Sequence, residues 1–189
     1  MQFIELEIPG AWLIEMEPHC DDRGFFARIW CQEEFRQHGL STALAQCSIS
    51  FNRKRGTVRG MHYQDAPHEE AKLVRCTQGV IYDVILDLRL DSTTRGSWRA
   101  VELSAQNHRM VYIPQGCAHG FQTLTDATEV MYQISTAYHP ESARGVRWND
   151  PAFGIRWPID EIVISDRDRQ FPLWPNHQAP ATTTLRRAS

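Results

Sequence analysis

The sequence has 189 residues, 42% hydrophobic and 23% charged, and these values are typical of one soluble globular domain with a sizeable core. Its net charge of -3 at pH 7 gives no whole-chain case for nucleic-acid binding, so an anionic partner would have to meet a local cluster of arginines. With no apolar h-region at its start, no apolar run long enough to cross a bilayer and no CxxC pair among its five cysteines, the sequence predicts a cytoplasmic protein with reduced thiols and no membrane partner.

The first predicted helix lies in "CQEEFRQHG" and ends at Gly39. A strand-like stretch follows in "TVRGMHYQ". Strict alternation places on one face Val58, Gly60, His62 and Gln64, and on the other Thr57, Arg59, Met61 and Tyr63. A buried imidazole beside valine and glycine needs a hydrogen-bond partner or a catalytic role.

The strongest strand signal is "VIYDVILDLR". One phase of its alternation is apolar and contains Val80, Tyr82, Val84, Leu86 and Leu88. The other phase is half polar and contains Ile81, Asp83, Ile85 and Asp87. Further short runs, "WRAVELS", "HRMVYIP" and "TEVMYQIS", are separated by turn signals. Many short strands at regular spacing favour an antiparallel sandwich or barrel.

The last third of the chain is less regular. The stretch "WNDPAFGIRWP" holds two prolines and two tryptophans and is predicted to be a packed loop. The polar end, "NHQAPATTTLRRAS", has few apolar residues and is predicted to be disordered. We therefore expect one domain over residues 1–176 and a disordered tail over residues 177–189.

Three local motifs carry polar side chains beside apolar ones: "DDRGFF", "RGMHYQ" with the following "KLVRC", and "IPQGCAHGF". Each motif alone is weak evidence of function, because a strand histidine is more often a hydrogen-bonded structural residue than a catalytic one. An exposed arginine is usually solvated surface. The functional interpretation rests on their combination.

Metal binding is one interpretation of these motifs, because "PQGCAH" resembles the second metal motif of cupin barrels. Those sites also need an H-x-H pair, and here His62 is followed by Tyr63 and Gln64. Lys72 lies one strand further on, and its ammonium would repel a divalent cation. We therefore predict no catalytic metal.

Histidine, lysine, tyrosine and arginine suit proton transfer at a carbon beside a carbonyl. Histidine is a general base near neutral pH, and lysine supplies a positive charge for an oxyanion. Tyr132 is in phase with Val130 and Ile134, so its phenol is predicted to face the interior and to donate a proton. The arginines would hold a phosphate group.

Taken together, these motifs resemble the dTDP-4-dehydrorhamnose 3,5-epimerases. The resemblance runs from about Phe3 to "ISDRDRQFP" and includes "DDRGFF", "RGMHYQ", "GVIYDVILDLR", "IPQGCAHGFQTL", "EVMYQIS" and "RWNDPAFGIRWP" in order. It implies an all-β, cupin-like antiparallel jelly-roll barrel with a few short helices. It also implies a homodimer that acts on a nucleotide-linked 4-keto-6-deoxy sugar without a cofactor.

The resemblance also implies roles for matching residues. His62 corresponds to the general base, and Asp168 to the carboxylate that pairs with it. Tyr132 corresponds to the acid on the opposite face of the sugar, and Lys72 to the residue close to the C4 oxygen. The other implied contacts are Arg23 and Arg59 at the diphosphate, Phe26 and Tyr138 as walls for the base, and Gln46 and His119 in the pocket.

Some positions depart from the family pattern. Arg28 stands where a glutamate commonly helps to hold the nucleotide, and "QCS" replaces "QDN", with Asn52 a few residues on. Ala143 replaces an acidic residue, and Arg167 replaces a pocket lysine with its charge retained. We expect Arg28, Asn52 and Arg167 to contribute to substrate binding. The catalytic set is intact, whereas part of the nucleotide shell has changed.

Besides metal-dependent cupin chemistry, which a metal analysis of the purified protein would decide, two alternatives stay open. One is a 3-epimerase or a 3,4-ketoisomerase on the same scaffold, which the fold alone does not separate from a 3,5-epimerase. The other is a non-catalytic sugar-nucleotide binding module, which loss of His62, Asp168 or Tyr132 would have favoured. None of the three is lost. The sequence leaves open the nucleotide, the centres inverted and the pathway, for which the resemblance implies dTDP-rhamnose-type sugar biosynthesis.

Overall fold

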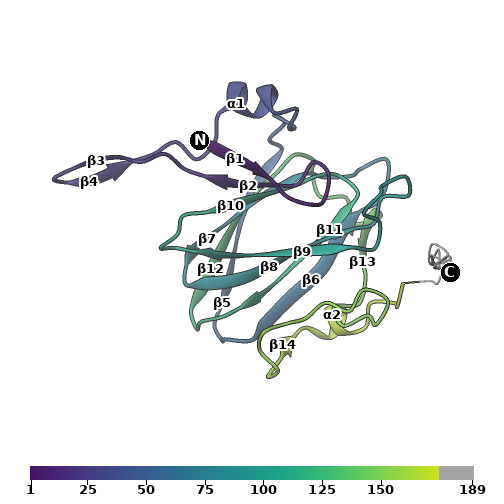
Figure 1. Cartoon of the computed structure of the whole chain (residues 1–189). Helices are drawn as coiled ribbons and strands as arrows, with labels where there is room; N and C mark the ends of the chain where they lie inside the picture. Colours follow the sequence, from purple (N-terminus) through teal and green to yellow (C-terminus); the bar gives the residue numbers. More distant parts are fainter. Residues whose placement is uncertain (175–189) are drawn as a thin grey trace, which may run out of the picture.

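Two antiparallel sheets face each other in the computed structural model, which describes residues 1–174 (Figure 1). The first sheet has the order β1 (Gln2–Glu5), β2 (Trp12–Glu15), β10 (Met110–Ile113), β7 (Lys72–Gln78), β12 (Thr128–Ile134) and β5 (Gln46–Asn52). The second has the order β13 (Ala143–Gly145), β6 (Thr57–Gln64), β11 (Cys117–Thr123), β8 (Val80–Asp87) and β9 (Trp98–Ser104), with β14 (Val163–Ile164) parallel to β6. This is the predicted cupin-like jelly roll. The predicted tail, residues 177–189, lies outside the described residues.

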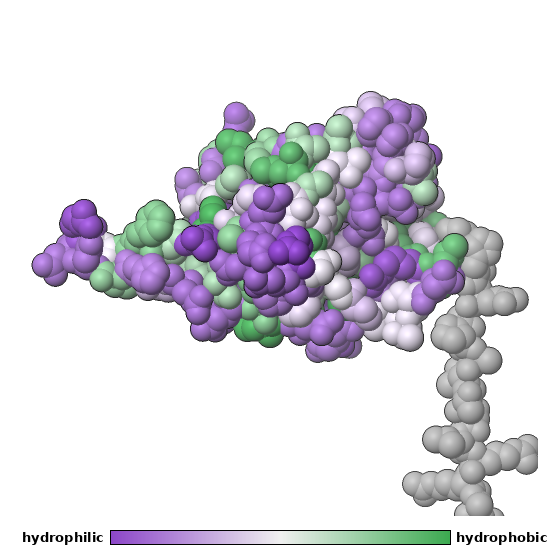
Figure 2. All heavy atoms as spheres, turned by 90° about the horizontal axis from the view of Figure 1, so that it is seen from above, coloured by the Kyte–Doolittle hydropathy of each residue, from purple (hydrophilic) through white to green (hydrophobic). Residues whose placement is uncertain are grey.

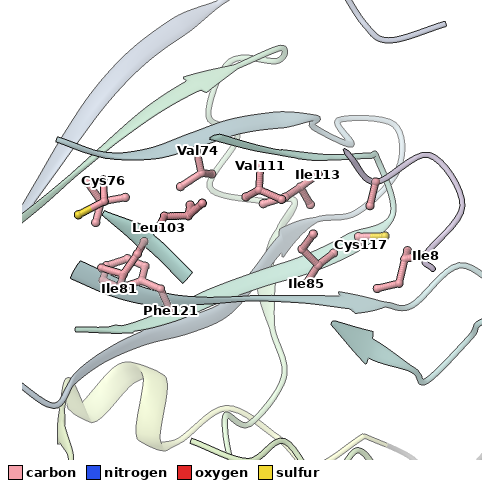
Figure 3. Packing of buried hydrophobic residues seen from close by; sticks show 12 residues of the cluster. Ile8, Val74, Cys76, Ile81, Ile85, Leu103, Val111, Ile113, Cys117 and Phe121 are labelled. Carbon is pink, nitrogen blue, oxygen red and sulfur yellow. The ribbon is translucent and has the colours of Figure 1, made fainter. Parts of the chain in front are cut away.

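The main hydrophobic core lies between the two sheets (Figure 3). The first sheet contributes Val74, Cys76, Val111, Ile113 and Val130, and the second contributes Ile81, Ile85, Leu103, Cys117 and Phe121. Side chains from strands distant in sequence meet there because each strand sends alternate residues to one face. Burial of this apolar surface is the main favourable contribution to the stability of the barrel.

The outer face of the second sheet is covered by the irregular segment that follows β13. Phe153, Ile155 and Trp157 pack there against outward side chains such as Met61 and Val84. The indole of Trp157 donates a hydrogen bond to the Trp148 carbonyl (2.9 Å). The predicted packed loop is confirmed, and it brings the C-terminal part of the described chain against β6.

The half-polar phase of β8 faces the barrel interior. Asp83 and Asp87 are both fully buried, next to Ile81 and Ile85 in the core. The apolar phase faces outward, under the C-terminal segment. Burial of a carboxylate is costly unless hydrogen bonds compensate it, so each of the two aspartates requires partners.

Asp87 has a full set of donors. Arg89 contacts it through Nη2 (2.7 Å), and the hydroxyls of Ser92 and Thr94 donate to Oδ2 at 2.5 and 2.7 Å. Burial raises the pKa of this carboxyl, but the hydrogen bonds from Arg89, Ser92 and Thr94 outweigh burial and lower it to about 2. Asp87 therefore organises the loop between β8 and β9.

An Asp87→Asn variant is expected to lose about 2 kcal/mol of unfolding free energy at pH 7, because buried donors lose an ionised acceptor. The folded-state pKa lies below the unfolded value of about 3.9, so this contribution is complete above that pH and disappears as pH falls towards 2. Urea unfolding of variant and wild type at pH 7 and pH 3 measures the difference, with the exposed Asp91→Asn as control. A difference that does not shrink at pH 3 would contradict the role of the charge.

The predicted early helix is confirmed as α1 (Gln32–Gln37). Gly39 follows with φ = 70°, a left-handed conformation that favours glycine and ends the helix. The buried ring of Phe35 packs α1 against the first sheet near Tyr112. No helix in the described residues is long and apolar enough to cross a membrane.

A separate two-stranded hairpin projects from the barrel (Figure 1). It consists of β3 (His19–Asp21) and β4 (Gly24–Phe26), and all of its strand residues are exposed. Seen from above, it extends beyond the body of the molecule and carries both hydrophilic and hydrophobic groups (Figure 2). Such an arm has little core of its own.

Candidate active site

His62 and Asp168 form a hydrogen-bonded pair. His62 Nε2 lies 2.9 Å from Asp168 Oδ1, and the second oxygen, Oδ2, accepts from the Gly60 amide at 3.2 Å. Asp168 belongs to α2 (Asp166–Arg169), whose first turn is capped by Ser165 Oγ, which accepts from the Asp168 amide (3.1 Å). With Nε2 held by the carboxylate, Nδ1 of His62 is the nitrogen free to accept a proton.

Asp168 stays ionised although it is buried. Burial raises the pKa of its carboxyl, but the hydrogen bond and charge of His62, and the Gly60 amide, together lower it below its ordinary value. The side chain of His62 is 39% exposed, whereas that of Asp168 is only 8% exposed. The carboxylate therefore sits behind an imidazole that faces open space, which is the order a general base requires.

Arg59 and His62 share a face of β6, contrary to the strict alternation predicted above. His62 pairs with His119 and Arg59 pairs with Phe121, with an irregular register between them. His119 and Phe121 are two residues apart on β11 and therefore point the same way. The extra residue in β6 brings Arg59 onto the face of His62, whereas Met61 faces outward against Val84, as alternation around His62 requires.

A second histidine–aspartate pair lies beside the first. His119 Nε2 is 2.8 Å from Asp83 Oδ2, and the two side chains are 5% and 0% exposed. His119 is the direct cross-strand partner of His62, so two imidazoles lie next to each other, each with its own carboxylate. Oδ1 of Asp83 has no hydrogen-bond partner within the described part of the chain. Asp83 was not among the site residues predicted from the sequence, although its place in the half-polar phase of β8 was the available signal.

Tyr132 approaches this group from the opposite sheet. It packs against the main core, and its ring lies 6.0 Å from the His119 ring, edge to face. The inward orientation predicted from its phase is confirmed. Burial, followed by the charge of Asp83, raises the pKa of the phenol well above its ordinary value. Tyr132 is therefore protonated at neutral pH and can only act first as an acid.

Lys72 is buried, and its ammonium already has a partner. Nζ lies 2.9 Å from Glu70 Oε1, and it donates to the backbone carbonyl of His62 at 3.4 Å. Glu70 was not among the site residues predicted from the sequence. The ammonium is thus close to the strand of His62, but its charge is shared with a neighbouring carboxylate.

Asn52 orients Arg59. Asn52 Oδ1 accepts from Arg59 Nε at 2.7 Å, and the Asn52 amide donates to the carbonyls of Ser50 and Thr128. Asn52 is fully buried, whereas Arg59 is exposed. The guanidinium is therefore held at Nε while its two terminal nitrogens remain available for an anion.

Gln46, Tyr138 and Arg167 lie around this region. By register, Gln46 shares the inner face with Ile134 and Lys72, and its Oε1 accepts from the Tyr138 amide at 3.1 Å. The Tyr138 side chain is exposed. The guanidinium of Arg167 lies 5.9 Å from the centre of the Phe171 ring, and that ring contacts His62 edge to face at 5.7 Å. Phe171, another residue that the sequence analysis missed, thus lies against both side chains.

Arg23, Phe26 and Arg28 are not brought into the barrel. Arg23 is at the tip of the projecting hairpin, where it pairs with Asp21, and its side chain is 90% exposed (Figure 1). Phe26 is also exposed, and Arg28 pairs with Glu34 of α1 at 3.1 Å. Within one chain, the predicted nucleotide contacts therefore fall into two separate groups.

Comparisons with known proteins agree with this geometry. The family model of dTDP-4-dehydrorhamnose 3,5-epimerase matches residues 5–176. The chain belongs to the dTDP-4-dehydrorhamnose 3,5-epimerase family. The family is one of isomerases, and the resemblance noted from the sequence is confirmed.

Three relatives illustrate the match. The epimerase of Methanothermobacter thermautotrophicus is 41% identical over 179 residues, which are 93% of this chain and 96% of that protein. The Bacillus anthracis epimerase, solved with TDP and PPi bound, is 41% identical with a TM-score of 0.88, over 92% of this chain and 99% of that one. A 3'-monoepimerase from Streptomyces bikiniensis, solved with dTDP-quinovose, is 37% identical with a TM-score of 0.83, over 89% and 85% of the two chains.

Proposed function

We propose that this chain epimerises a dTDP-linked 4-keto-6-deoxyhexose at C3, C5 or both, without a cofactor, in dTDP-rhamnose-type sugar biosynthesis in the cytoplasm. The observation that carries the proposal is the His62–Asp168 pair (2.9 Å), with Tyr132 in the facing sheet, in a chain of this family. A base and an acid on two facing sheets are what inversion at carbon needs, because the proton must leave from one side and return on the other.

The chemistry balances without a redox step. The C4 ketone acidifies the neighbouring C–H bonds, and His62 Nδ1 takes one proton while the electron pair moves to the C4 oxygen. Asp168 stabilises the imidazolium, and the Lys72 ammonium stabilises the enolate oxygen. Tyr132 then returns a proton to the opposite face of the carbon, and the tyrosinate regains one from solvent or from the imidazolium. Stabilisation of the enolate by a preorganised donor contributes several kcal/mol in comparable sites, about 3–4 for one oxyanion donor.

The number of carbon centres that are inverted distinguishes a 3,5-epimerase from a 3'-monoepimerase. Both a 3,5-epimerase and a 3'-monoepimerase are among the relatives at similar identity. Incubation with dTDP-4-keto-6-deoxyglucose in D₂O, followed by NMR, reads deuterium at each carbon. Deuterium at C3 and C5 supports the 3,5-epimerase, and deuterium at C3 alone supports the monoepimerase. No deuterium at either carbon would favour a binding module.

Arg59 is proposed to hold the diphosphate, because Asn52 fixes its Nε and leaves the rest of the guanidinium available. Loss of one charge-assisted contact costs about 1.5–3 kcal/mol, so Arg59→Ala should weaken dTDP binding by roughly ten-fold or more. Isothermal calorimetry with dTDP measures this. Arg109→Ala, which removes an exposed arginine paired with Glu15, is the matched control. Equal dTDP affinity in the two variants would show that Arg59 does not bind the diphosphate.

We propose that the protein is a homodimer in which the hairpin of one copy completes the site of the other. Arg23 and Phe26 lie on an arm that projects from the barrel, too exposed to be stable contacts of their own chain. On the outer face of the first sheet, edge strand β5 also exposes Ile49 (67%) and Phe51 (51%), apolar surface that a second copy can cover.

Mixing two inactive variants tests this arrangement. In a mixed dimer of Arg23→Ala and His62→Ala chains, one site combines an intact barrel with an intact hairpin. An equal mixture, unfolded and refolded together, is expected to regain about a quarter of wild-type activity, because half of the dimers are mixed and each has one whole site. No recovery, or a monomer of 21.8 kDa in sedimentation experiments at micromolar concentration, would overturn the shared site.

A further inference from the structure

Two surface loops outside the proposed reaction site bring together two histidines and a glutamate. His68 lies between β6 and β7, whereas His139 and Glu141 lie between β12 and β13. Their ligand atoms all lie within 4.8 Å of one another. His139 Nδ1 is 3.0 Å from Glu141 Oε1, and His68 Nε2 is 4.0 Å from the same oxygen.

The backbone at this cluster is held by one buried side chain, Gln64. The Gln64 amide donates to the carbonyls of His68 (2.9 Å) and Ala137 (3.2 Å), and its oxygen accepts from the His139 amide (2.6 Å). Gln64 is only 3% exposed and belongs to β6. Both histidines are thus fastened to the same rigid strand, so the cluster is a built feature and not a chance approach of two mobile loops.

The spacing suits a small transition-metal ion. Ligands about 2.0–2.2 Å from a tetrahedral Zn²⁺ lie about 3.3 Å from each other. The 3.0 and 4.0 Å separations lie on either side of this value.

The rings of His68 and His139 must be reoriented before both can bind one ion. Their rings are stacked, with centres 3.5 Å apart and planes 6° from parallel, so their in-plane lone pairs do not converge. Coordination of one ion by both rings therefore requires rotation of at least one ring about χ2, a torsion with a broad energy profile. The side chains have room for this, since His68 is 32% and His139 34% exposed.

We propose that His68, His139 and Glu141 bind a divalent transition cation of the zinc type, with water in the remaining positions. Imidazole and carboxylate are the ligand types that Zn²⁺ accepts, and two histidines disfavour Mg²⁺ and Ca²⁺. The ion would not take part in the proton transfer. It would fasten the segment of Tyr138, which is the residue next to His139 and whose amide is bound by Gln46.

Calorimetric titration of the metal-stripped full chain with ZnCl₂ tests the site. We expect one equivalent to bind, and Glu141→Gln and His139→Gln to weaken binding at least ten-fold. His108→Asn is the matched control, because His108 lies in another loop with φ = 54°, which asparagine tolerates. The titration uses a background with Cys20→Ser and Cys47→Ser, since both cysteines are exposed free thiols.

Two outcomes would overturn the proposal. One is unchanged zinc affinity in Glu141→Gln, a change of an exposed side chain that leaves the fold intact. The other is loss of binding in His62→Asn or His119→Asn with full binding in Glu141→Gln, which would put the ion in the barrel. A Co²⁺ spectrum of the wild type adds a check that needs no variant. Nitrogen and oxygen ligands give weak visible bands, whereas an intense near-ultraviolet band would reveal thiolate ligands instead.

Discussion

Replacing His62 with alanine is expected to abolish hydrogen exchange and epimerisation while leaving the fold intact. The imidazole is the group with a free nitrogen beside an ionised carboxylate, and general bases contribute about 10²- to 10⁴-fold to rate. We expect deuterium uptake from D₂O at the exchanging carbons to fall by about 10³-fold or more. The side chain is 39% exposed, so its removal opens no core cavity, and the cost in stability is the lost hydrogen bond of Asp168, which keeps the Gly60 amide.

Three controls make the result specific. Affinity for dTDP should be unchanged by calorimetry, and circular dichroism should match the wild type. His38→Ala, at the end of α1, should keep full activity.

Asp168→Asn should lose about a hundred-fold or more of the activity, because the amide no longer favours the correct tautomer of His62 or its imidazolium form. If His62→Ala exchanged C3 hydrogen at the wild-type rate, the base would have to be another residue.

Replacing Tyr132 with phenylalanine is expected to separate proton removal from inversion. The ring packs in the main core, and phenylalanine keeps that packing, so fold and ligand binding should be retained. His62 should still remove a proton and give it back to the same face. Inversion should slow by about 10²-fold, most of all at C5, because the acid on the other face is gone.

The readout for Tyr132→Phe is the ratio of exchanged substrate to inverted product by NMR. Tyr82→Phe is the matched control, because Tyr82 packs on the outer face of the second sheet near Trp157. Inversion at the normal rate in Tyr132→Phe would reduce this tyrosine to a packing role. The pKa of Tyr132 is raised, so its deprotonation should not limit the wild-type rate below about pH 10.

Local patterns were sufficient to predict most of the strands and the orientation of Tyr132. Alternation of apolar residues in β8 and β12 is a period-2 signal that regular pairing preserves. The same rule was wrong for Arg59, because an irregular register in β6 shifts the phase by one residue. Such a shift depends on the partner strand β11. Its Gly120 lies so close to Gly60 that a Cβ added to Gly60 would be 2.6 Å from the Cα of Gly120.

Contacts between distant segments were beyond prediction from pattern alone. Asp83 could be placed on a half-polar face, but which histidine it would meet depends on the register of β8 and β11. Phe171 beside His62 was missed for the same reason, whereas Glu70 is only two residues from Lys72 and was missed although the two are close in the sequence. The hairpin motif "DDRGFF" was found, but only the structure shows that it projects from the barrel (Figure 1).

The distance along the chain between the two members of the catalytic pair has a consequence for the newly made protein. Asp168 follows His62 by 106 residues and is synthesised after every strand of both sheets, β14 included. A ribosome-bound chain can therefore form both sheets before its imidazole has a carboxylate behind it. The His62–Asp168 pair is completed last, when α2 docks on β6, so an unfinished or truncated barrel would lack the carboxylate that supports the proposed base.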